Sequence, residues 1–224
     1  MKKIILILFV TSIVIACKKE DAPACEDCLA FYFEHPQPIS FSELQGFPNR
    51  FKGLYISKDS TFIKIEENRI LREYFFKYRI HKRLLDSLKA EYNIVNNQLI
   101  NRETKEKFAF YKKGDSLELV TNHIDTLFRF SYNQKAKRIK NQLVLSTRDS
   151  VFWRIEVLSL ENKIIKFKNI YEREDLKKLD SVTAIKGKML DSTSYLIKPT
   201  PREFRSVLRI KHLGTDQEYK KVSQ

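Results

Sequence analysis

The stretch DSVFWRIE at residues 149–156 decides the predicted fold of this chain. Its alternate residues are apolar, so that Val151, Trp153 and Ile155 point one way while Arg154 and Glu156 point the other. This period of two predicts a half-buried β-strand. The following ENK at 161–163 predicts a turn, because Asn tolerates a left-handed backbone, with the return strand starting at Ile164. The stretch therefore opens a β-hairpin.

A similar stretch, DSTFIKIE, lies at 59–66, and five of the eight positions are identical. Two further pairs follow in the same order: ENRILR at 67–72 with ENKIIK at 161–166, and LDS at 85–87 with LDS at 179–181. Three matching blocks in one order predict an internal tandem duplication. Because the period exceeds that of solenoid repeats, the copies are expected to be two half-domains or two small domains.

The remaining elements are predicted from periodicity and turn residues. Short helices are expected at 81–89 and 172–180, and a third at 202–211 behind Pro201. Further strands are expected at 107–111, 116–121, 125–130 and 194–197, with turns at 112–115 and 121–123. The predicted fold class is β-rich α+β, made of meandering antiparallel hairpins with about three short helices.

These elements divide the chain into five expected segments. They are a signal peptide at 1–16, an N-terminal tether and approach to the body at 17–50, copy 1 at 51–130, a basic linker at 131–140, and copy 2 with a C-terminal helix at 141–224. In the linker, alternate charges from Lys135 to Lys140 predict a solvated segment.

The chain of 224 residues has a formal net charge of +14. Such a balance favours anionic partners, namely lipid headgroups, acidic glycans or acidic proteins.

The N-terminal residues predict export from the cytoplasm and attachment to a membrane. Lys2 and Lys3 precede an apolar run from Ile4 to Val10 that is too short to span a bilayer, as in a secretory signal. Val14-Ile15-Ala16-Cys17 resembles the lipobox of bacterial lipoproteins, which implies cleavage before Cys17 and acylation of that residue with a diacylglycerol and a chain such as palmitate. Such anchoring holds a protein on a membrane.

The resemblance to outer-membrane and surface lipoproteins extends through residues 18–21. Lys18-Lys19-Glu20-Asp21 resembles the charged signal that displays some Gram-negative lipoproteins on the cell surface; a solvated tether on the periplasmic face is the alternative. This location makes nucleic acid an unexpected partner.

Cys25 and Cys28 form a C-x-x-C motif in the tether. Zinc binding would need two further ligands, and no second C-x-x-C or His pair follows. In an oxidising compartment the expected result is a small disulfide loop.

The sequence contains no recognisable catalytic or cofactor motif. The chain has no G-x-S-x-G, its four histidines are scattered, and its five glycines have no phosphate-loop spacing. No metal site or cofactor is expected. Asp115 and Asp125 could approach across a hairpin as an acid/base pair.

An aromatic and basic stretch is the candidate binding patch. Its residues would stack on sugars or lie at a lipid headgroup layer, or its aromatic residues would face a core while the cations face solvent. The patch is Arg72, Tyr74, Phe76, Lys77, Tyr78 and Arg79.

We expect a non-catalytic, lipid-anchored cell-envelope protein that binds an anionic, glycan or protein partner. An envelope hydrolase and an immunity-type protective lipoprotein are the alternatives.

Overall fold

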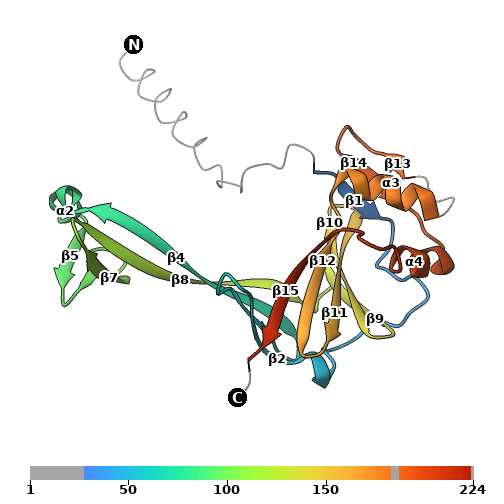
Figure 1. Cartoon of the computed structure of the whole chain (residues 1–224), viewed down its shortest axis with the longest axis horizontal. Helices are drawn as coiled ribbons and strands as arrows, with labels where there is room; N and C mark the ends of the chain where they lie inside the picture. Colours follow the sequence, from blue (N-terminus) through green and yellow to red (C-terminus); the bar gives the residue numbers. More distant parts are fainter. Residues whose placement is uncertain (1–27, 183–186, 223–224) are drawn as a thin grey trace, which may run out of the picture.

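The structure is a computed structural model that describes residues 28–182 and 187–222. It is built mainly of antiparallel strands (Figure 1). In the described residues the elements are, in chain order, β1 (Ala30–Phe33), the 3₁₀ turn η1 (Asn49–Phe51), β2 (Gly53–Ile56), β3 (Phe62–Ile65), β4 (Arg69–His81), the 3₁₀ turn η2 (Lys82–Leu84), α2 (Leu85–Leu88), β5 (Tyr92–Val95), β6 (Gln98–Asn101), β7 (Lys107–Lys113), β8 (Ser116–Arg129), β9 (Gln134–Ile139), β10 (Gln142–Asp149), β11 (Phe152–Glu161), β12 (Ile164–Asn169), α3 (Arg173–Val182), β13 (Lys188–Met189), β14 (Ser194–Ile197), α4 (Pro201–Val207) and β15 (Thr215–Lys221).

The body of the molecule is a curled sheet around an inner core. The strands run in the order β9-β10-β11-β12-β15-β2-β3-β4-β8, and each contributes an apolar side chain to that core. The curl returns β8 to β9, where the Gln134 side chain accepts a hydrogen bond from Arg129 N and donates one to Leu127 O. Phe47 and Phe51 belong to the same core and lie beside the turn after β3, since Phe47 N donates to Glu67 O.

A second core lies on the outer face of the sheet. There Val144 of β10 and Trp153 of β11 pack with Leu179 of α3 and Phe204 of α4. Figure 1 shows both helices on this side of the body. Strand β11 is therefore covered on both faces, by the inner core and by the helices.

An arm projects from the body (Figure 1). It consists of residues 74–123, in which β4 and β8 continue as a long antiparallel pair and β5, β6, β7 and α2 form the tip. The pairing register between β4 and β8 shifts between Ile70 and Leu71, which leaves Leu127 of β8 without a paired residue on β4. Such a bulge bends a strand, and here it lies where the arm leaves the body.

The tip has a small core of its own, in which Leu99, Phe110, Leu117 and Leu119 are buried. Between tip and body, residues 74–76 pair only with 121–123, because β3 ends its pairing at Glu73 and β7 begins at Val120. We call these six residues the neck.

The structure confirms the predicted fold class and several elements. The hairpin β11–β12 turns through Asn162 and Lys163, both left-handed with φ of 48° and 64°. The predicted strand at 194–197 matches β14, and Thr200 caps α4 through a capping box with Pro201 in its first turn.

The predicted basic linker at 131–140 is wrong, because residues 134–139 form the strand β9. Ala136 and Ile139 are buried, and so is Lys137, whose Nζ donates to the carbonyl oxygens of Pro36 and Pro38 at 3.0 Å each. Burial lowers the pKa of Lys137. Alternate charges here mark a strand whose lysine finds backbone partners.

The predicted tether at 17–50 is too long, since β1 lies within it. This strand pairs in parallel with β14 and meets β11 at Trp153, and it buries Phe31 and Phe33. Parallel pairing with a strand more than 160 residues away leaves no local sequence signal.

The predicted turn at 121–123 is also wrong, because β8 runs unbroken from Ser116 to Arg129. Thr121, Asn122 and His123 continue the pairing with β4 and form half of the neck. Polar residues in this strand reflect solvent on both of its faces.

The tandem duplication stays a prediction. Ser60 and Ser150 share a left-handed backbone at equivalent positions, with φ of 64° and 57°. However, Ile63 packs in the inner core, whereas its counterpart Trp153 packs in the outer one. The two hairpins thus resemble one another locally while burying opposite faces.

Candidate functional site

The inward faces of the body strands change from apolar to polar at one end of the curled sheet. On β11, the inner-core residue Leu158 shares its face with Glu156 and Arg154, which lie two and four positions before it. On β4, the core residue Ile70 is followed by Arg72. The same change places Thr147, Asn169 and Gln217 at this level. Two pockets open there.

The first pocket lies where the arm leaves the body and has a volume of about 330 Å³. We call it the junction pocket. It is lined by Asp59, Thr61, Arg72, Tyr74, Phe76, Gln217 and Tyr219. Planar polar groups therefore meet aromatic rings in one hollow.

Arg72 connects this pocket to the arm. Its Nη2 donates to Asp125 Oδ2 at 2.8 Å, and its guanidinium carbon lies 5.2 Å from the centre of the Tyr74 ring. Hydrogen bonding to Arg72 lowers the pKa of Asp125. Within the described residues, the buried Nε of Arg72 has no hydrogen-bond partner. One donor of the guanidinium is thus left over at the pocket.

Rings continue from the pocket along one face of the arm. Tyr74, Phe76 and Tyr78 alternate on β4 with centroid distances of 5.1 and 6.0 Å, and His123 stacks on Tyr74 at 5.6 Å. We call these four residues the aromatic face. It is solvated, since Phe76 is 44% and Tyr78 50% exposed.

The aromatic face lies between two packed regions of the same side of β4. Side chains two apart on a strand share a face, so the face that buries Ile70 in the body is bare at Phe76 and packs again at Ile80 against the tip core. From Arg72 to Tyr78 this side of β4 is about 20 Å long at ~3.3 Å per residue.

The structure brings together part of the predicted patch. Arg72 lies on the same side of β4 as Tyr74, Phe76 and Tyr78 of the aromatic face. Lys77 and Arg79 point to the opposite side of β4, where Arg79 pairs with Glu118 at 3.2 Å. The interpretation that aromatic residues face a core is wrong for this stretch, because both faces of the neck are solvated.

The second pocket lies inside the body where β1 and β12 part, and has a volume of about 810 Å³. We call it the body pocket. Strand β12 pairs with β11 from Glu156 onward, and β1 meets β11 only at Trp153. Its lining includes the apolar Leu29, Phe31, Leu127 and Leu145 and the charged Arg154 and Glu156.

The charged groups of the body pocket have unusual surroundings. Burial raises the pKa of the Glu156 carboxyl, opposed by a hydrogen bond from Asn169 and by the charges of Arg154 and Arg72. In residues 28–182 and 187–222, Glu156 and Arg154 each lack an ion-pair partner within 4 Å. The sequence assigned both to the polar side of a half-buried strand. Arg154 is exposed as expected, whereas Glu156 is half-buried, which alternation along β11 alone does not indicate.

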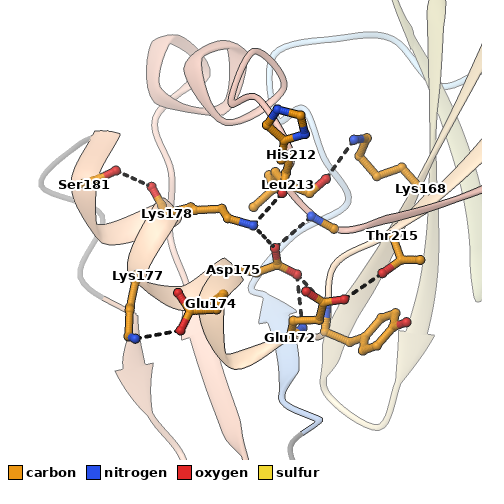
Figure 2. Close-up of polar contacts among 12 residues, drawn as sticks. Lys168, Glu172, Glu174, Asp175, Lys177, Lys178, Ser181, His212, Leu213 and Thr215 are labelled. Atoms are coloured by element: carbon orange, nitrogen blue, oxygen red, sulfur yellow. Dashed lines mark hydrogen bonds and ion pairs between the residues drawn. The ribbon is translucent and has the colours of Figure 1, made fainter.

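Another acid, Asp175 at the start of α3, is buried and has a structural role (Figure 2). Its carboxylate accepts hydrogen bonds from Glu172 N at 3.1 Å and Gly214 N at 2.8 Å, and Lys178 lies 3.5 Å away. Gly214 has φ of 68°, and a Cβ there would lie 2.3 Å from the Asn169 oxygen. These contacts clamp the segment before β15 onto α3.

Other predicted groups are not brought together. Asp115 lies at the turn between β7 and β8, whereas Asp125 pairs with Arg72 ten residues along β8, so the predicted acid/base pair is wrong. Within the part of the chain that the structure describes, no group of three His, Cys, Asp or Glu could hold a metal ion. Cys28 is disulfide-bonded, while Cys25, the predicted lipidation site Cys17 and the predicted signal peptide lie outside the described residues.

Comparisons with known proteins add no family. No protein-family model matches the chain, and no curated protein or solved structure matches it either. Over residues 28–182 and 187–222, no helix is both long and apolar enough to cross a membrane.

Proposed function

We propose that this is a non-catalytic lipoprotein, anchored to the outer membrane through Cys17, that binds a glycan chain along the aromatic face. The observation that carries the proposal is that a row of rings lies solvated between two packed cores and ends in the junction pocket. Exposing large rings along a narrow ribbon gives the fold little stability, because an isolated two-stranded pair is marginal in water. A partner that covers the rings would offset that weakness.

The chemistry of the aromatic face and the junction pocket favours a glycan over an apolar partner. Ring faces offer apolar contact to the C–H faces of sugars, while Asp59, Arg72 and Gln217 at the pocket end offer planar donors and acceptors to hydroxyl pairs. The rings of Phe76 and Tyr78 are exposed along β4, so an extended polymer can lie across them. The net charge of +14 favours a glycan that carries anionic groups.

Binding is tested on purified protein with lipopolysaccharide and a neutral oligosaccharide, maltoheptaose, as probes. Phe76→Ser is compared with Phe75→Ser, because both rings are 44% exposed on the same strand but point to opposite faces. We expect Phe76→Ser to weaken lipopolysaccharide binding about tenfold, as for the loss of about 1.4 kcal/mol of stacking. Equal effects of the two variants would contradict the proposal.

Two other partners give different results. If the partner is an anionic lipid, the protein is expected to bind phosphatidylglycerol vesicles as well as lipopolysaccharide, with little effect of Phe76→Ser. If the partner is an envelope protein, the purified protein is expected to bind neither lipopolysaccharide nor maltoheptaose. Either result would replace the glycan in the proposal.

The anchor is tested separately in cells. We expect Cys17→Ser to release the protein from the membrane fraction, because acyl chains are the proposed attachment. A Cys17→Ser protein that stays equally membrane-bound would contradict the anchor. Protease treatment of intact cells then separates surface display from the periplasmic face.

A further inference from the structure

The body pocket contains a pair of opposite charges that the fold itself does not use. Arg154 and Glu156 are two residues apart on β11 and so share its inward face. Their Cα atoms are therefore about 6.6 Å apart at ~3.3 Å per residue. Over the described residues, neither forms an ion pair, either with the other or with a neighbour.

Glu156 is half-buried, and this position disfavours its charged form. Partial removal of the carboxylate from water, with no cation of the described residues within 4 Å, is why burial raises the pKa of this group. Asn169 supplies one hydrogen bond, which leaves further acceptor capacity on the carboxylate. Asp175 is the contrasting case, because its carboxylate has several donors within the fold.

The pocket has the size and lining of a small-molecule site. Its volume of about 810 Å³ lies within the range of ~300–1,000 Å³ typical of such sites. Apolar residues of β1, β8 and β10 line it together with the two charges, among them Phe31, Leu127 and Leu145. An occupant would thus need an apolar body and two charged ends.

We infer that the body pocket binds a small zwitterion with an apolar body, of the amino acid or short peptide class. The ligand's ammonium lies against Glu156, and its carboxylate lies against Arg154. The half-buried Glu156 and the exposed Arg154 then each gain an ion-pair partner, while the apolar part of the ligand contacts the apolar lining. This site shares no lining residue with the junction pocket and does not depend on the glycan proposal.

The test is calorimetric titration of the full protein at pH 7 with leucine and three forms of Leu-Leu: the free dipeptide, its N-acetyl form without the ammonium, and its amide without the carboxylate. We expect a free zwitterion to bind and each capped form to bind at least tenfold more weakly. Leucine and Leu-Leu separate a free amino acid from a short peptide as the preferred member of the class.

Variants identify which end meets which residue. In Glu156→Gln the penalty for N-acetylation is expected to disappear, and in Arg154→Gln the penalty for the amide is expected to disappear. Glu161→Gln, at the exposed end of the same strand, is the control and is expected to behave as wild type. Thermal unfolding of each variant shows that it is folded.

Two results overturn the inference. One is that neither leucine nor Leu-Leu binds the folded wild type. The other is that the capped and free forms bind equally, or that Glu156→Gln and Arg154→Gln leave the discrimination unchanged. Because Phe76→Ser leaves this pocket intact, a failed glycan test has no bearing on the result.

Discussion

At the residue scale, the buried Asp175 and the half-buried Glu156 differ in what surrounds their carboxyl groups. Asp175 is fully buried and accepts hydrogen bonds from three backbone N–H groups, those of Tyr171, Glu172 and Gly214. Glu156 has one amide neighbour and distant cations. The first acid is therefore expected to stabilise the fold, and the second to weaken it.

Asp175→Ala is expected to lower the free energy of unfolding by about 2–3 kcal/mol, because the buried donors lose their acceptor. Urea denaturation measures this loss. Glu174→Ala is the control on the same helix, since Glu174 is exposed and, among the residues that the structure describes, pairs with Lys177. Equal losses in the two variants would show that the clamp in Figure 2 contributes little.

Glu156→Gln is expected to raise the thermal unfolding temperature near neutral pH. Burial raises the folded-state pKa of Glu156, so the folded state holds the proton more tightly than the unfolded chain. As pH rises through the unfolded value of about 4.3, wild type loses stability, and above the folded pKa the loss is complete. The groups facing the carboxyl are Asn169, Arg154 and Arg72.

The stabilisation by Glu156→Gln is therefore expected to vanish below pH 4, where the carboxyl is protonated in both states. Thermal scans from pH 3.5 to pH 8 measure the difference. A difference that is constant with pH would mean that the glutamine acts by packing alone.

At the scale of elements, the neck is the weakest part of the fold. Residues 74–76 and 121–123 pair with each other only, and their side chains belong to neither the body cores nor the tip core. We expect their amides to exchange with solvent through local opening that costs about 2–3 kcal/mol, well below the cost for β10 and β11. Hydrogen exchange followed by mass spectrometry tests this, and equal protection in neck and body would contradict it.

At the scale of the whole molecule, body and arm have separate cores. Tyr74 and His123 are paired, so residues 75–122 can be replaced by Asn-Gly to close a two-residue hairpin between them. We expect the shortened protein to unfold within about 3 °C of wild type, because the removed residues contribute nothing to the body cores. Its failure to fold cooperatively would show that the arm supports the body.

Sequence patterns predicted the local parts of this architecture. Hairpin β11–β12, strand β14 and helix α4 follow from alternation, turn residues and capping, all of which act over a few residues. The sequence could not place β1 beside β14, or show that Lys137 finds backbone carbonyls, because these depend on contacts across the chain.

The candidate sites were predicted in part for the same reason. Alternation on β4 marked the aromatic residues, but only the arm's projection into solvent decides that they are exposed. Alternation on β11 marked Arg154 and Glu156 as one face, but whether that face meets solvent or an interior depends on the curl of the whole sheet.

Strand β15 has a consequence for the order of events when the chain folds. It lies between β12 and β2, pairing Lys220 with Ile56, so β2 and β12 each lack one of their two neighbouring strands until residues 215–221 are present. Long-range pairing of this kind is slow to form. The arm pairs residues that are near in sequence and can assemble first, which leaves the body to be completed only after residues 215–221 have emerged.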